Sequence, residues 1–130
     1  MVVDSSAVVA ILEDEPERPS FARALARAAD PLISAATLLE ASIVMHWKAG
    51  DQGIEDLDAL LLSAGIRVAA VDIAQAHAAR DAWLRYGKGR SPAGLNFGDC
   101  FSYALAKTTG RPLLYKGNDF AHTDVTSATS

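Results

Sequence analysis

The sequence predicts an α/β protein, a three-layer α/β/α sandwich with a central, mainly parallel sheet. Two observations lead to this prediction. Short aliphatic runs alternate along the chain with longer stretches of helical spacing, an order that favours parallel strands with helices on both faces. The 130 residues, half of them hydrophobic and 22% charged, suit one domain over residues 1–130, and no repeat or low-complexity segment divides them.

Two strands and four helices are expected in the first half of the chain. The aliphatic runs VVD and LIS are the strands. Apolar residues at three- and four-residue steps predict helices over residues 5–14, 21–30, 35–48 and 53–64. Pro16 and Pro19 bracket a break between the first two helices, and Gly50 is expected to stop the third.

The second half is expected to add two strands, two helices and one long loop. IRVAAV and PLLYKG are the strands, and helices are predicted over residues 73–86 and 97–110. Asp72 is placed to cap the first of these helices, while Asn96 or Gly98 opens the second. GKGRSPAG between the helices is a loop, and the terminal DVTSATS is expected to add a short edge strand.

Composition excludes several classes of protein. The longest apolar stretches are too short to span a membrane, and Met1 leads directly into VVD, so we expect no cleaved signal segment. Cys100 is the single cysteine, which excludes an internal disulfide and makes a cytoplasmic location the expectation. The net charge of −4 argues against a general nucleic-acid coat but permits a local basic patch.

Four acidic residues lie in apolar surroundings, unlike most of the 16 Asp and Glu: Asp4, Glu40, Asp99 and Asp119. Asp4 ends the first strand, and Asp119 follows the last strand within a short turn. Glu40 and Asp99 lie in the first turns of helices. Because sites in parallel sheets form at the carboxyl ends of strands, we expect the four acids to converge on one edge of the sheet.

Each acid also has a purely structural explanation. Asp4 and Asp99 suit the amino ends of helices, Glu40 stands at capping-box spacing from Thr37, and Asp119 suits a turn. The four together favour a cation, since two carboxylates about 5 Å apart repel by roughly 3 kcal/mol at an effective dielectric near 20. Oxygen ligands without a Cys or His pair suit Mg²⁺ or Mn²⁺, ions that orient a phosphodiester and activate a water.

Further polar residues are candidates for contact with substrate. Ser6 is placed to add a hydroxyl to the metal shell, although it equally suits the first turn of a helix. Asn96 and Asn118 are candidates for orienting water or phosphate, and both also suit turns. The candidates for gripping a phosphate backbone are the cations that precede the last two acids: Lys88, Arg90 and Lys116. A solvated helix face explains the neighbouring basic residues equally well.

Taken alone, the residues leave other functions open. A phosphohydrolase of small phosphate esters would use similar acids, but the DxD pattern of one such class is absent because Ser5 and Ser6 follow Asp4. A phosphate-accepting receiver domain would need an acidic pair after the first strand. A non-catalytic binding or regulatory module is the third alternative, and it would bind no divalent ion.

Four segments carry a resemblance to a known family: MVVDSSAVVAIL, SAATLLEA, GRSPAGLNFGDCFSYALAK and PLLYKGNDFAHTDV. They span nearly the whole chain, which resembles PIN-domain proteins of the VapC type, the ribonuclease toxins of bacterial type II toxin–antitoxin pairs. In that family the metal-binding acids correspond here to Asp4, Glu40, Asp99 and Asp119. The resemblance implies a PIN-like α/β/α domain and an endoribonuclease that depends on Mg²⁺ or Mn²⁺.

The resemblance also implies protein partners. It implies a homodimer and a small cognate antitoxin whose tail wraps the toxin and obstructs the acidic site; a membrane partner is not expected. The helical stretches 21–29 and 38–47 are candidates for the groove that binds the antitoxin, and their apolar stripes equally suit an ordinary core.

Overall fold

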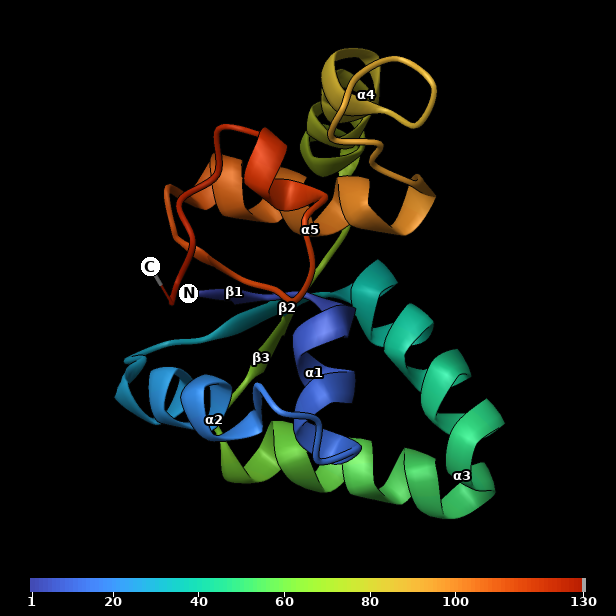
Figure 1. Cartoon of the computed structure of the whole chain (residues 1–130), viewed down its shortest axis with the longest axis vertical. Helices are drawn as coiled ribbons and strands as arrows, with labels where there is room; N and C mark the ends of the chain where they lie inside the picture. Colours follow the sequence, from blue (N-terminus) through green and yellow to red (C-terminus); the bar gives the residue numbers. More distant parts are fainter. Residues whose placement is uncertain (130) are drawn as a thin grey trace.

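A four-stranded parallel sheet lies at the centre of the protein (Figure 1). The computed structural model describes residues 1–129. Its strands are β1 (Val2–Val3), β2 (Leu32–Ser34), β3 (Arg67–Ala69) and β4 (Leu113–Leu114). They follow the order β3-β2-β1-β4, and every pairing is parallel. Since β1 is an inner strand, Asp4 directly after it lies at the middle of the sheet's carboxyl edge.

Helices cover both faces of this sheet, so the predicted three-layer α/β/α sandwich is confirmed (Figure 1). One face carries α1 (Ser5–Leu12), α2 (Arg18–Arg27) and α3 (Ala35–Ser63). The other face carries α4 (Ile73–Tyr86), α5 (Phe97–Thr109) and the short 3-10 helix η1 (Phe120–His122). No helix within residues 1–129 is long and apolar enough to cross a membrane.

The strands divide their side chains between two hydrophobic cores. Val2, Leu32 and Leu113 pack toward α4 and α5. Successive side chains of a strand point to opposite faces of the sheet. The next residue of each strand therefore packs toward α1, α2 and α3; these residues are Val3, Ile33 and Leu114. Strands of only two or three residues therefore suffice to join both helical layers.

The helix α3 is bent at Gly50, where the backbone has φ 61° and ψ −145°. The left-handed φ suits glycine, which lacks a Cβ. The bend separates two helical arms that correspond to the two predicted helices (Figure 1). Gly53, in the first turn of the second arm, lies in close contact with the first arm, since a Cβ there would lie 2.3 Å from the carbonyl oxygen of Met45.

The boundaries of α2 differ from the prediction. The helix begins at Arg18, so Pro19 lies in its first turn instead of preceding it. Proline is tolerated at this position because the first helical amides have no partner within the helix. The helix ends at Arg27, three residues before the predicted end, and leaves Asp30 free to interact with the sheet's amino edge.

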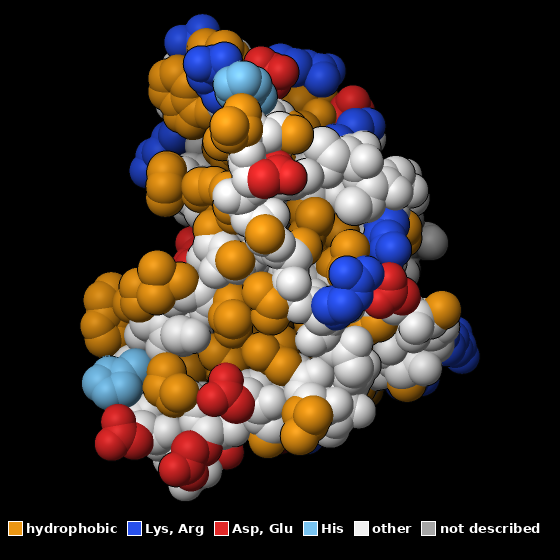
Figure 2. All heavy atoms as spheres, turned by 180° about the vertical axis from the view of Figure 1, so that it is seen from behind, with side chains coloured by type: hydrophobic (Ala, Val, Ile, Leu, Met, Phe, Trp, Pro, Cys, Tyr) orange, Lys and Arg blue, Asp and Glu red, His pale blue; other side chains and the backbone are white. Residues whose placement is uncertain are grey.

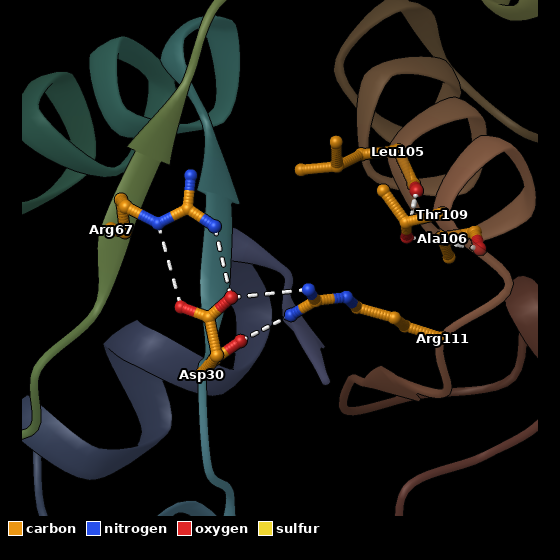
Figure 3. A network of polar contacts seen from close by, with 6 residues as sticks. All are labelled: Asp30, Arg67, Leu105, Ala106, Thr109 and Arg111. Atoms are coloured by element: carbon orange, nitrogen blue, oxygen red, sulfur yellow. Dashed lines mark hydrogen bonds and ion pairs between the residues drawn. The ribbon is translucent and has the colours of Figure 1, made fainter.

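Asp30 joins the amino ends of two strands (Figure 3). Its carboxylate accepts hydrogen bonds from Arg67 at the start of β3 and from Arg111 before β4, with Nη2–Oδ2 distances of 2.9 and 3.1 Å. Arg111 also donates to the Asp30 backbone carbonyl. The two guanidinium groups, that of Arg67 first, hold the pKa of the Asp30 carboxyl below its usual value.

The C-terminal segment covers the outer edge of β4. Leu113 N donates to the carbonyl of Thr126 at 2.8 Å, and Ala128 N donates to the carbonyl of Leu113 at 2.9 Å. These bonds form a single parallel bridge between Leu113 and Ser127. The predicted edge strand is therefore present in its shortest form.

Candidate active site

Asp4 is almost fully buried, with 2% of its surface exposed. It caps the amino end of α1: its Oδ2 accepts hydrogen bonds from Ser6 N at 3.1 Å and from Ser6 Oγ at 2.7 Å. The structural explanation for Asp4 thus holds, but it is incomplete. Oδ1 accepts a 2.5 Å bond from Ser102 Oγ of α5, on the other side of the sheet.

Glu40 lies in α3 and points toward the start of α1. Its Oε1 accepts a 2.8 Å hydrogen bond from Ser5 Oγ. The capping-box explanation is wrong, because Ser34 caps α3 and the Thr37 hydroxyl contacts Ser102 instead. Burial raises the pKa of the Glu40 carboxyl, and the charge of Asp4 raises it further.

Asp99 is held in a reciprocal cap with Asn96 at the start of α5. Asp99 Oδ2 accepts from Asn96 N at 3.1 Å, and Asn96 Oδ1 accepts from Asp99 N at 2.9 Å. Asn96, not Gly98, therefore opens the helix. Burial raises the pKa of Asp99 to about 7, and the charges of Asp4, Asp119 and Glu40 add to this effect.

Asp119 lies in the exposed turn between β4 and η1, where its side chain caps no helix. The beginning of this turn is tied to the same edge of the sheet, because Lys116 N donates a 3.0 Å hydrogen bond to Ser6 Oγ. The charge of Asp119 contributes to the raised pKa of Asp99. The turn explanation is therefore compatible with a place beside the other acids.

The four carboxylates share one electrostatic environment without a balancing cation. Each of the other three raises the pKa of Asp99. Within residues 1–129, none of the four forms an ion pair with Lys, Arg or His. In the same range, no three Asp, Glu, His or Cys side chains stand close enough to enclose a metal ion as they are placed.

The donor set at this edge fits a hard divalent cation. It consists of carboxylates with the Ser6 hydroxyl close by, which is the ligand chemistry of Mg²⁺ and Mn²⁺. Cys100 does not convert it into a zinc site: burial raises the pKa of this thiol to about 11, and the thiol donates to the Asn96 carbonyl. A divalent cation would relieve the repulsion that the acids impose on one another.

Gly98 is a site residue that the sequence did not reveal as such. A Cβ at Gly98 would lie 2.1 Å from Glu40 Oε2 and 2.9 Å from Oε1. The missing side chain therefore lets the first turn of α5 approach the Glu40 carboxylate. The only signal in the sequence is the position of Gly98, in the first turn of a predicted helix and next to Asp99. Glycine is unfavourable in helices, so its presence there requires another reason.

The candidate phosphate-binding cations have different surroundings. Lys88 is exposed in the loop before α5. Arg90 stacks on the Trp83 ring at 4.9 Å from its centroid and donates to the Leu84 carbonyl. The ammonium of Lys116 lies between two glutamates, 3.0 Å from Glu15 Oε1 and 3.1 Å from Glu17 Oε2. Lys116 is thus already neutralised, unlike the two cations near α4.

Two apolar grooves meet beside the acids at Phe97 and Phe101. One lies between α4 and α5 and includes Trp83, and the other lies between α3 and α5 and includes Trp47. Phe97 is 80% exposed and Trp47 is 81% exposed. Hydrophobic side chains also stand out over α3 and around α4 in the view from behind (Figure 2). Such a surface is typical of a protein interface.

The two helical stretches proposed for an antitoxin groove line two different grooves. The α2 helix lines a groove with the far arm of α3, at Leu60, Ser63 and Ala64. Residues 39–47 instead line the groove with α5. The bend at Gly50 turns the two arms of α3 in different directions (Figure 1). Where an antitoxin would bind stays a prediction.

The fold and the site define a class: three-layer domains with a parallel sheet and a group of carboxylates at its carboxyl edge. The family model for the PIN domain matches residues 1–125. Ribonuclease VapC30 of Mycobacterium tuberculosis is 50% identical over 125 residues, covering 96% of this chain and 95% of that protein. Ribonuclease VapC of Mycolicibacterium smegmatis is 52% identical over 125 residues, covering 96% and 97%.

The chain therefore belongs to the PIN-domain family and, within it, to the VapC ribonucleases. The fold agrees with a solved structure, that of Mycobacterium tuberculosis VapC20, described as a toxin that cleaves the sarcin-ricin loop. The two superpose with a TM-score of 0.79 over 99% of this chain and 98% of the other at 20% identity.

Proposed function

We propose that this protein is the toxin of a type II toxin–antitoxin pair and cuts RNA internally with the help of Mg²⁺ or Mn²⁺. The observation that carries the proposal is the group of four carboxylates without a cationic partner; burial raises the pKa of Asp99 to about 7, and the charges of the other three acids add to this effect. The relatives, which are named ribonucleases, support RNA as the substrate.

The residues proposed to hold the ion are Asp4, Glu40, Asp99 and Asp119. A bound divalent ion would neutralise charge on the phosphodiester and activate a water for attack on phosphorus. The chain's own groups prepare this site. Ser5 orients Glu40, and Asn96 fixes the Asp99 carboxylate. Burial, with the charges of Asp4, Asp119 and Glu40, raises the pKa of Asp99 to about 7, and a bound cation would favour its ionised form.

RNA is proposed to approach from the side of α4 and the loop that follows it. Lys88 and Arg90 would contact phosphates there, and Arg90 is already oriented by the Trp83 ring. Ser6 and Asn96 act on the acids that they hydrogen-bond. Lys116 could join the RNA contacts only after leaving Glu15 and Glu17.

The proposed homodimer forms through the apolar surface at Phe97, Leu39, Ile43, Trp47 and Trp83. These five side chains are between 42% and 81% exposed, a cost that burial in an interface would remove. Phe97→Asp is expected to shift the protein from dimer to monomer in sedimentation velocity. Monomeric wild-type protein at the same concentration would refute this surface.

The cognate antitoxin is proposed to be encoded beside this chain. Growth arrest on expression of this chain should be relieved when the neighbouring open reading frame is expressed with it.

A comparison of two helix-capping aspartates tests the active site directly. Asp4 and Asp72 both cap helices through a side-chain oxygen, and Asn caps helices about as well as Asp. Asp4→Asn should therefore leave the fold intact by circular dichroism yet abolish cleavage of RNA in Mg²⁺ or Mn²⁺. Asp72→Asn is the matched control and should cleave at the wild-type rate. Full activity of Asp4→Asn would refute the proposed site.

A further inference from the structure

Asp4 obtains its hydrogen bonds from neutral donors on two different layers of the protein. Ser6 supplies its amide and hydroxyl to Oδ2 from the α1 side, and Ser102 supplies its hydroxyl to Oδ1 from α5. Ser102 has no exposed surface. A buried carboxylate without a cation depends on such donors, because an unsatisfied buried charge is costly.

The hydroxyl of Ser102 is part of a directed chain. A hydroxyl carries one proton, and Ser102 gives it to Asp4. The 3.2 Å contact between Thr37 Oγ1 and Ser102 Oγ must then have Thr37 as donor and Ser102 as acceptor. Thr37 is 1% exposed. The order of donation is therefore Thr37 to Ser102 to Asp4, with no solvent needed along the way.

The hydrogen bonds from Thr37 to Ser102 and from Ser102 to Asp4 link the three parts of the fold that carry Glu40, Asp99 and Asp4. Thr37 precedes Glu40 by three residues in α3, and Ser102 follows Asp99 by three residues in α5. Residues three apart lie on the same face of a helix. The two hydroxyls thus fix one turn of each helix relative to Asp4, and the neighbouring turns hold Glu40 and Asp99.

The hydrogen bonds also determine what Asp4 has left to offer. A carboxylate has about four acceptor sites. Oδ2 accepts two hydrogen bonds from Ser6, and Oδ1 accepts one from Ser102. About one site therefore remains, on Oδ1. The atom that Ser102 orients is the atom with capacity for a cation.

We propose that Ser102 and Thr37 are positioning residues for the metal site: Thr37 orients the Ser102 hydroxyl, which holds Asp4 Oδ1 in place to bind the ion. This inference rests on the proposed function, because it concerns the same ion. Ser102 acts on the ion only through Asp4, and Thr37 acts only through Ser102.

The test measures binding of Mn²⁺ alone to metal-stripped protein by calorimetry, at a temperature where every variant is folded. Ser102→Ala should weaken Mn²⁺ binding by about 10- to 100-fold, as loss of an outer-shell partner does. Thr37→Val, which keeps the side-chain volume, should weaken it by a smaller factor. The double variant should bind no more weakly than Ser102→Ala, because Thr37 has no other route to Asp4.

Matched controls remove hydroxyl groups from the same helices. Ser42 in α3 donates to the Leu38 carbonyl, and Thr109 in α5 donates to the Leu105 carbonyl. Ser42→Ala and Thr109→Val should therefore bind Mn²⁺ like the wild type.

In RNA cleavage, Ser102→Ala should recover part of its lost kcat at high Mn²⁺ concentration, while its KM for RNA stays unchanged. A purely structural defect would show no such recovery.

The possible results separate this inference from the proposed function. Wild-type protein that binds no Mn²⁺ would overturn both. Wild-type binding with unchanged affinity in folded Ser102→Ala would overturn the positioning role alone, and so would independent, multiplying effects of the two substitutions. If Ser102→Ala does not fold, Thr37→Val decides, and unchanged affinity in that variant overturns the chain of donation.

Discussion

The two edges of the sheet treat aspartate in opposite ways. At the amino edge, Asp30 lies between Arg67 and Arg111, and its pKa is lowered. At the carboxyl edge, burial raises the pKa of Asp99 to about 7, and the charges of three other acids add to this effect. The first arrangement is complete within the protein, whereas the second calls for a cation. Only the second therefore reads as a site for chemistry.

The largest expected effect comes from neutralising one aspartate at each edge. Asp99→Asn should lower the rate of RNA cleavage by more than about 100-fold, because it removes a proposed ligand, and outer-shell losses alone reach that size. Its thermal midpoint without metal should not fall, since the substitution removes repulsion. Asp30→Asn should do the reverse, with near wild-type cleavage and a lower midpoint. Cleavage by Asp99→Asn at the wild-type rate would remove the contrast between the edges.

A second effect is expected at two glycines that each lie against a neighbouring group: Gly98 against the Glu40 side chain and Gly53 against the Met45 backbone. Gly98→Ala places a Cβ against the Glu40 carboxylate, which is the end of a flexible side chain. The side chain should yield, so activity should fall about tenfold or more while stability changes little. Gly53→Ala meets the rigid backbone of Met45 instead and should cost about 1–3 kcal/mol of stability. Urea unfolding and RNA cleavage, measured on both variants, would show whether this division holds.

The third effect is a pH dependence of opposite sign at the two edges. A carboxyl group whose pKa is raised by folding destabilises the protein once the pH rises above the ordinary pKa of that group. The metal-free protein should therefore lose stability between about pH 4 and 7, by about 2 kcal/mol after allowance for the partial exposure of Asp99. Asp30 has a lowered pKa in the folded protein, so it adds stability at pH values above its ordinary pKa. This stability is lost as the pH falls through the lowered pKa.

Urea unfolding in EDTA at several pH values measures both effects. The decline toward neutral pH should become much smaller in Asp99→Asn, where only the raised pKa of Glu40 remains, and it should persist in Asp30→Asn. Added Mg²⁺ or Mn²⁺ should reverse the decline in the wild type, because the ion favours the ionised carboxylates. A wild-type stability that rises steadily from pH 4 to 7 in EDTA would contradict the raised pKa of Asp99.

The smallest effect concerns Lys116, which lies close to the carboxyl edge but pairs with Glu15 and Glu17. Glu15→Gln with Glu17→Gln should release the ammonium and tighten RNA binding by a few-fold, with a slightly steeper salt dependence. Adding Lys116→Met should cancel that gain. Fluorescence anisotropy with a labelled RNA at two salt concentrations is sufficient. Unchanged RNA binding in the double glutamine variant would confine Lys116 to a structural role.

The elements that follow strong local patterns were predictable from the sequence. The order of strands and helices, the stop at Gly50 and the cap at Asp72 all follow from short-range chemistry. The start of α2 was missed because Pro19 reads as a break and also fits a first helical turn. The direction of the bend at Gly50 could not be predicted, because it depends on tertiary packing.

The grouping of the four acids followed from the sequence, but the side chains that hold them did not, and the role of the acids as metal ligands stays a prediction. Acids in apolar surroundings pointed to Asp4, Glu40, Asp99 and Asp119, and topology directed them to one edge. Ser102 and Thr37 carry no comparable signal, because buried serine and threonine in helices usually bond to the backbone. Their pairing spans 65 residues of sequence and becomes visible only in three dimensions. The same holds for Lys116, whose partners lie about 100 residues away.

The C-terminal bridge to β4 has a practical consequence for solubility. Residues 126–128 occupy the backbone groups of Leu113 that would otherwise face outward. A protein shortened at residue 125 would keep all four acids and the full span of the family match, yet it would present an unpaired strand edge. Unpaired edges recruit strands from other molecules. Such a shortened ribonuclease should aggregate on concentration, and its loss from solution would be mistaken for loss of activity.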